Sequence, residues 1–138
     1  MLEKRPRITW SLLCLALLAV GCGPKTDRLA ISGQVNLDGA PLDEGSIRFT
    51  SGGDNPMAAG ALIREGSYQI PAEKGLLPGE YAVVIRSPDN DAPKILYEGF
   101  PTAPDRIPSQ YNAASTLKVQ VSRDAENSFK FDISSDKK

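Results

Sequence analysis

Cysteine and histidine, which often carry nucleophilic or metal chemistry, are scarce in this chain. The sequence contains two cysteines, Cys14 and Cys22, and no histidine. Cys22 follows a mostly apolar segment, residues 8–20, which is itself preceded by Lys4, Arg5 and Arg7. A basic start, an apolar stretch and small residues before a cleavage point are typical of an export signal. The sequence therefore predicts that residues 1–21 form a signal peptide and that Cys22 is the thiol that reacts.

Residues 15–22, Leu-Ala-Leu-Leu-Ala-Val-Gly-Cys, resemble the lipobox of bacterial lipoproteins. The resemblance implies cleavage between Gly21 and Cys22, diacylglycerol on the Cys22 sulfur and an acylated new amino terminus. Two or more acyl chains hold a protein stably on a membrane, whereas a single chain binds reversibly. We therefore expect a cell-envelope protein whose membrane partner is reached through a lipid anchor. Gly23 stands where Asp often signals inner-membrane retention, and this favours the outer membrane or the cell surface.

Two other interpretations of the N-terminal segment stay open. It could be an ordinary secretory signal that contains Cys22, or an anchor that is not cleaved. The apolar segment is shorter than the stretch of about 20 residues that a transmembrane helix needs. No second apolar stretch follows it in the sequence.

Charge and length limit what the remaining chain does. Removing the three basic residues and one acidic residue of the signal from the 16 basic and 17 acidic residues of the chain leaves a net charge of −3. These charges are spread along the sequence without the basic run of a nucleic-acid-binding protein, so no nucleic-acid partner is expected. The length suits one domain. We place a tether at residues 22–29, the domain at 30–134 and a polar tail at 135–138.

The residue types argue against catalysis. With Cys14 removed and Cys22 lipidated, neither a Ser-His nor a Cys-His arrangement is available. No spacing marks a Ser-Lys pair, and the adjacent acids Asp43 and Glu44 are interpreted as solvated turn residues. Asp89-Asn90-Asp91 offers oxygen ligands of the kind that calcium prefers, but it lacks the spacing of a calcium loop. We predict no enzyme activity, no cofactor and no metal site.

Short segments with alternating apolar residues recur along the chain. Val83, for example, shares one strand face with Tyr81 and Ile85. Turn signals such as Asp38-Gly39 and Glu65-Gly66 separate these segments. The pattern predicts an all-β fold, a single Greek-key antiparallel β-sandwich of about seven strands. The predicted strands are residues 30–37, 46–50, 59–64, 67–70, 80–86, 116–121 and 128–133.

Four sequence pieces in order carry a family resemblance. They are ISGQVNLDGAPLDEGSIRF, AGALIREGSYQI, LLPGEYAVVI and IPSQYNAASTLKVQVSRDAENSFKFDI. With these pieces the chain resembles carboxypeptidase-regulatory-like, or transthyretin-like, domains of small bacterial lipoproteins. The resemblance implies a Greek-key β-sandwich without an active site, and it does not imply peptidase activity.

The proline-rich segment 87–115 is the candidate for function. We read it as an extended excursion with a short helical turn near residues 93–97. Its aromatic residues Tyr97, Phe100 and Tyr111 either form a surface patch for a ligand or pin the segment onto the sandwich, and pinning is the favoured interpretation.

Two functional hypotheses follow from these observations. The first is a lipid-anchored cell-envelope β-sandwich that acts as a non-catalytic binding or structural module, with an envelope protein or glycan as a possible partner. The alternative is a carbohydrate- or peptide-binding module that uses the loop at residues 88–111. The sequence leaves the oligomeric state open.

Overall fold

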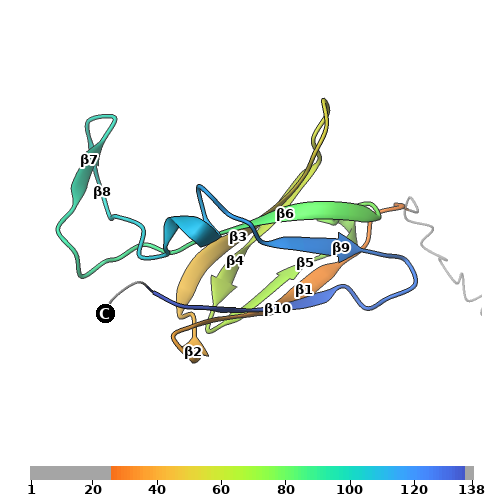
Figure 1. Cartoon of the computed structure of the whole chain (residues 1–138), viewed down its shortest axis with the longest axis horizontal. Helices are drawn as coiled ribbons and strands as arrows, with labels where there is room; N and C mark the ends of the chain where they lie inside the picture. The colour runs from red at the N-terminus through yellow and green to blue at the C-terminus, as the bar shows by residue number, and fades with distance from the viewer. Residues whose placement is uncertain (1–25, 136–138) are drawn as a thin grey trace, which may run out of the picture.

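The computed structural model describes residues 26–135 and shows an all-β fold with almost no helix. The fold class predicted from the sequence is therefore confirmed. The described part contains ten strands and two single-turn 3₁₀ helices (Figure 1). The elements are β1 (Ile31–Leu37), β2 (Ala40–Pro41), β3 (Glu44–Ser51), β4 (Ala58–Arg64), β5 (Ser67–Ile70), η1 (Ala72–Lys74), β6 (Gly79–Arg86), β7 (Ile95–Tyr97), β8 (Phe100–Thr102), η2 (Ser109–Tyr111), β9 (Lys118–Val121) and β10 (Ser128–Ile133).

The main sheet folds over into two layers. Its strand order is β10-β1-β5-β4-β3-β6-β9, with β2 attached to β1. β4 and β5 are paired only at Arg64 and Ser67, so the sheet bends at this hairpin. The ring of Phe49 in β3 lies 6.0 Å from that of Tyr68 in β5 and 6.4 Å from that of Phe129 in β10. The layer β10-β1-β5 therefore packs face to face on the layer β4-β3-β6-β9.

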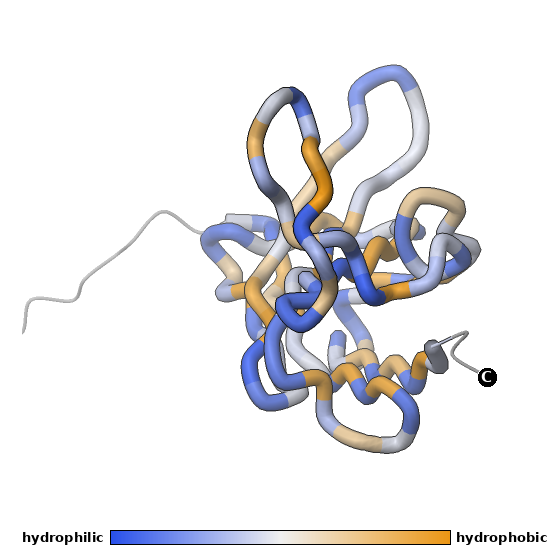
Figure 2. Tube along the Cα trace, turned by 90° about the vertical axis from the view of Figure 1, so that its left-hand side faces the viewer, coloured by the Kyte–Doolittle hydropathy of each residue, from blue (hydrophilic) through white to orange (hydrophobic). Residues whose placement is uncertain are grey.

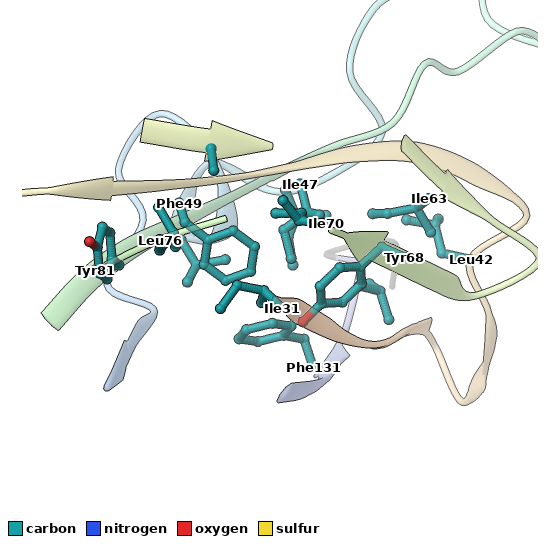
Figure 3. Packing of buried hydrophobic residues seen from close by; sticks show 14 of the residues in the cluster. Ile31, Leu42, Ile47, Phe49, Ile63, Tyr68, Ile70, Leu76, Tyr81 and Phe131 are labelled. Atoms are coloured by element: carbon teal, nitrogen blue, oxygen red, sulfur yellow. The ribbon is translucent and has the colours of Figure 1, made fainter. Parts of the chain in front are cut away.

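Alternation along the strands builds the core between these layers (Figure 3). In β6, Tyr81, Val83 and Ile85 are buried, while their neighbours point outward. Complete burial of an aliphatic side chain stabilises the fold by about 1.5–3 kcal/mol. Three residues outside the predicted strands also join the core: Leu42, Leu76 and Ile107.

Both predicted two-residue turns are present. Asp38 and Gly39 have φ angles of 52° and 85°, and Glu65 and Gly66 have φ angles of 50° and 79°. Positive φ at both central residues gives the turn whose twist matches that of antiparallel strands. The first turn joins β1 only to the two-residue β2, and the second is the hairpin at which the layers divide.

One strand pair departs from the predicted antiparallel arrangement: β1 and β10 run parallel. The connection after β9 carries the chain across to the other layer, where β10 lies beside β1. Gly33 faces Phe129 in this pair, and a Cβ there would lie 1.9 Å from the Phe129 carbonyl oxygen. The close approach of the two strands therefore depends on glycine.

The prediction of a helical turn at residues 93–97 is wrong. Residues Ile95–Tyr97 form β7, which pairs with β8 across the turn Glu98-Gly99, whose φ angles are 50° and 85°. The helical turn lies later, at η2, directly after Pro108. The described part has ten strands, whereas the sequence predicted about seven. The three strands that were not predicted, β2, β7 and β8, are only two or three residues long and show little alternation.

Candidate functional site

The segment between β6 and β9 projects as a hairpin on a closed stem. Pro88 and Asp105 form an antiparallel bridge at its base. The Asp89 amide donates to the Pro104 carbonyl at 2.7 Å, and the Arg106 amide donates to the Ser87 carbonyl at 2.9 Å. These bonds fix the two arms side by side, so the β7–β8 hairpin is held out from the sandwich (Figure 1).

The carboxylate of Asp105 ties this stem together. It accepts hydrogen bonds from the backbone amides of Ser87 at 3.1 Å and Ile107 at 2.9 Å. Its second oxygen accepts from the Asn112 side chain at 3.2 Å and lies 3.8 Å from Nη1 of Arg86. The Asp105 carboxylate thus links the residues that begin the segment between β6 and β9 to the residues that end it.

The hydroxyl of Ser87 forms two hydrogen bonds that hold the stem together. Ser87 is 1% exposed, and its Oγ donates to the Glu44 carbonyl at 2.5 Å and accepts from Nε of Arg106 at 2.8 Å. The same Arg106 pairs with the Asp43 carboxylate, and this contact lowers the pKa of Asp43 below its usual value. Glu44 accepts a hydrogen bond from Asn90. The two adjacent acids therefore bind different partners at the stem and form no shared carboxylate pair.

Asp89-Asn90-Asp91 forms a turn at the start of the hairpin. Oδ1 of Asp89 accepts from the amides of Asp91 at 3.3 Å and Ala92 at 3.2 Å. Within residues 26–135 there is no group of three or more Cys, His, Asp and Glu side chains that could hold a metal ion.

The three aromatic residues singled out in the sequence lie in two different places. Tyr97 and Phe100 face each other across the β7–β8 turn and are 64% and 72% exposed. Tyr111 lies in η2 and packs against the hydrophobic core. Tyr111 thus pins the segment to the sandwich, whereas Tyr97 and Phe100 stand in solvent with Ile95, 51% exposed, and Leu96, 77% exposed.

A groove of about 580 Å³ runs between the hairpin and the outer face of β3 and β4. Ile95 and Tyr97 form its wall, and Leu62 lies on its floor. The lining also carries two basic residues, Arg64 and Arg86, and two acidic ones, Glu44 and Asp105. A second hollow on the same face, along β3 and β4, shares Ser46 and Leu62 with the first. The groove therefore continues across the outside of the sheet.

No protein-family model, curated protein or solved structure matches the chain. The lipoprotein assignment and the resemblance to transthyretin-like domains accordingly remain expectations from the sequence. Gly21 and Cys22 lie outside the described residues. In the part that the structure describes, no helix is long and apolar enough to cross a membrane.

Sequence reasoning missed Leu62. It occupies an outward position of β4, between the inward residues Ala61 and Ile63, and is 61% exposed. A large aliphatic residue at a polar position of an alternating strand was the available signal.

The N-terminal approach to the domain lies at the opposite end from the hairpin (Figure 1). Nη1 of Arg28 donates to the Gly75 carbonyl at 2.9 Å. Leu29 pairs with Leu76 through two backbone hydrogen bonds of 2.7 and 3.1 Å. Asp27 forms an ion pair with Arg123 at 3.3 Å. Residues 27–29, the last three of the predicted tether 22–29, thus already contact the sandwich.

Proposed function

We propose that this chain is a lipid-anchored cell-envelope β-sandwich that acts as a non-catalytic binding module through its β7–β8 hairpin and the adjoining groove. The observation that carries the proposal is the exposure of four large apolar side chains on one small hairpin: Ile95, Leu96, Tyr97 and Phe100. Ile95, Tyr97 and Phe100 share one face of the hairpin, and an exposed apolar patch beside polar residues is typical of an interaction site.

Rigidity of the stem supports binding. The hydrogen bonds of Asp105 and Ser87 hold the hairpin in place before any partner arrives. A surface that is already ordered loses less conformational entropy on binding than a mobile loop.

Anchor geometry would turn the hairpin away from the membrane. The four Cα–Cα steps from Cys22 to Thr26 span at most about 14 Å. A lipid on Cys22 would keep the Thr26 end of the domain close to the bilayer. The hairpin, at the other end of the long axis, would then be available to a partner (Figure 1).

A second candidate is the carbohydrate- or peptide-binding module expected for residues 88–111. The observation in its favour is that Tyr97 and Arg64 both line the groove. The lining combines aliphatic and charged side chains with a single aromatic ring, that of Tyr97, so a peptide suits it better than a sugar, which favours a flat aromatic platform.

Metabolic labelling with an alkyne analogue of palmitate tests the anchor. The full chain expressed in a bacterial host should incorporate the label, Cys22→Ala should abolish it, and Cys14→Ala should retain it. Labelling that persists in Cys22→Ala, or its absence from the unaltered chain, would refute the anchor.

Photo-crosslinking tests the binding surface. Benzoylphenylalanine introduced at Phe100 should give adducts in the envelope, whereas the same residue at Lys130, exposed on the opposite layer, should give few. Equal adduct yields at the two positions would refute a binding role for the hairpin.

A further inference from the structure

We propose that the hairpin binds a second copy of this chain: the acidic, apolar β7–β8 hairpin of each protomer would dock on the basic outer face of β4-β3-β6-β9 in the other. This proposal rests on the binding role of the hairpin and names its partner. The two surfaces that would meet belong to the same chain and have opposite charge.

The outer face of the layer β4-β3-β6-β9 carries excess positive charge. Four basic residues are exposed on it, against two acidic ones: Arg48, Arg64, Arg86 and Lys118, against Glu44 and Glu80. Glu80 is already paired with Lys118 at 3.0 Å. Among residues 26–135, neither Arg48 nor Arg64 forms an ion pair.

Small residues keep this face flat between the arginines. Ala58 and Gly60 of β4 and Ala82 of β6 occupy outward positions, so little side-chain volume stands above the sheet. The two hollows that share Ser46 and Leu62 lie over this area. An incoming hairpin would therefore meet an open apolar floor bordered by guanidinium groups.

The hairpin has the complementary character. Glu98 is the one charged side chain among residues 95–102, which form β7, its turn and β8. Strand pairing places Tyr97 opposite Phe100 and Ile95 opposite Thr102, so these four side chains share one face of the hairpin. Glu98 lies in the turn at the tip. The hairpin thus offers an apolar face that ends in a negative charge.

The hairpin does not cover the basic face of its own copy. The groove between them is open, and the stem bonds hold the hairpin away from the sheet. In Figure 2 two loops rise from the same side of the domain: the hairpin with the orange apolar stretch of β7, and the hydrophilic connection between β3 and β4. A two-fold axis through the space between them would place each hairpin over the floor of its partner, which gives a closed and self-complementary contact.

Crosslinking of the full chain in cells tests this proposal. Benzoylphenylalanine at Phe100 should give an adduct with twice the mass of one chain, and its crosslinked peptide should map to residues 44–64. The same residue at Lys130 serves as the matched control. The yield of the double-mass adduct should fall with rising salt, because exposed charges are screened.

Charge reversal provides the decisive comparison. Glu98→Lys alone, and Arg48→Glu with Arg64→Glu, should each lower the double-mass adduct at least about tenfold, because each brings like charges together across the interface. Co-expression of the two altered chains should restore the adduct between them. All three positions are turn or outward-strand residues, and unchanged thermal unfolding would show that the fold is retained.

The remaining outcomes separate this proposal from the general binding role. A double-mass adduct that both reversals leave unchanged would overturn the proposed contact. Adducts with other proteins only would overturn self-association and leave the binding module standing. Absence of any adduct above the Lys130 control would overturn both.

Discussion

Tyr68 joins the two layers of the sandwich, and its hydroxyl is the best point at which to test the packing. Its ring packs against Phe49 of the opposite layer, and the residue is 4% exposed. Its hydroxyl donates to the Phe129 carbonyl at 2.9 Å, passing over Gly33, where a Cβ would lie 2.6 Å from the hydroxyl oxygen. Tyr68→Phe keeps the ring and removes only this bond.

The expected loss of stability at neutral pH is modest. A net hydrogen bond contributes about 0.5–1.5 kcal/mol, and a buried group left without a partner costs about 1–3 kcal/mol. We therefore expect Tyr68→Phe to lower the free energy of unfolding by about 1–2 kcal/mol at pH 7.

The pH dependence gives the sharper result. Burial raises the pKa of Tyr68 above its usual value. The unfolded chain ionises this tyrosine near pH 10 and the folded chain does not, so the stabilisation is complete below about pH 10 and is lost as the pH rises above it. Above that pH, wild type should lose about 1.4 kcal/mol per pH unit more than Tyr68→Phe. The stability curves of wild type and Tyr68→Phe should therefore cross at about pH 11.

Urea unfolding followed by circular dichroism between pH 7 and pH 11.5 measures both effects. Tyr81→Phe is the matched control, because the Tyr81 hydroxyl also donates to a backbone carbonyl, that of Leu77, at 2.9 Å. Burial raises the pKa of Tyr81 as well, while its bond to Leu77 opposes the rise. If the curves for wild type and Tyr68→Phe stay parallel from pH 9 to pH 11.5, the hydroxyl is not buried as described.

Two further substitutions test the turns and the stem. Gly39→Ala should lower the free energy of unfolding by about 1–2 kcal/mol, because its φ is positive although a Cβ there meets nothing within 4 Å. Gly66→Ala should lower it by about 1–3 kcal/mol more, because its Cβ would lie 2.6 Å from Cβ of Pro41. Equal losses in thermal unfolding would refute this steric argument. Asp105→Ala should destabilise the stem by about 1.5–4 kcal/mol through three lost hydrogen bonds, and the amide of Ser87 should exchange its hydrogen faster. Unchanged exchange at Ser87 would show that the stem does not depend on this carboxylate.

Strands and turns could be predicted because local sequence determines them. Alternation of apolar and polar residues states which side of a strand faces the core, as in β6 and β10. Asp-Gly and Glu-Gly pairs supply the positive φ angles of tight turns. Tyr68 and Tyr81 are both buried, and both hydroxyls donate to backbone carbonyls.

Strand partners could not be predicted in the same way. An alternating strand can pair with any other strand that has apolar residues on the same face. Alternation therefore does not indicate whether β10 or another strand lies beside β1. The parallel pair depends on a glycine at position 33, because the Tyr68 hydroxyl and the Phe129 carbonyl occupy the space above it. Such a requirement appears only after segments far apart in the sequence have been brought together.

The hairpin was hidden by its prolines, although its turn signal was present. Pro93 and Pro101 suggested irregular structure, yet Pro101 lies in a two-stranded ribbon opposite Leu96. Proline is tolerated in such strands where no amide is needed for pairing. Glu98-Gly99, with an aromatic residue on each side, was the signal of a two-residue turn.

Comparison of the hairpin with the core shows why the candidate surface lies there. In the strands of the main layers most large apolar side chains point inward, and the outward exceptions are the exposed Leu62 on β4 and the partly buried Val84 on β6. The other strongly exposed large apolar residues gather on β7 and β8, beside the same groove. A fold that buries its apolar residues elsewhere and leaves them exposed on two facing surfaces gains nothing in stability from that exposure. Contact with a partner accounts for both surfaces at once, because it removes from water the apolar area of the hairpin and that of the floor together.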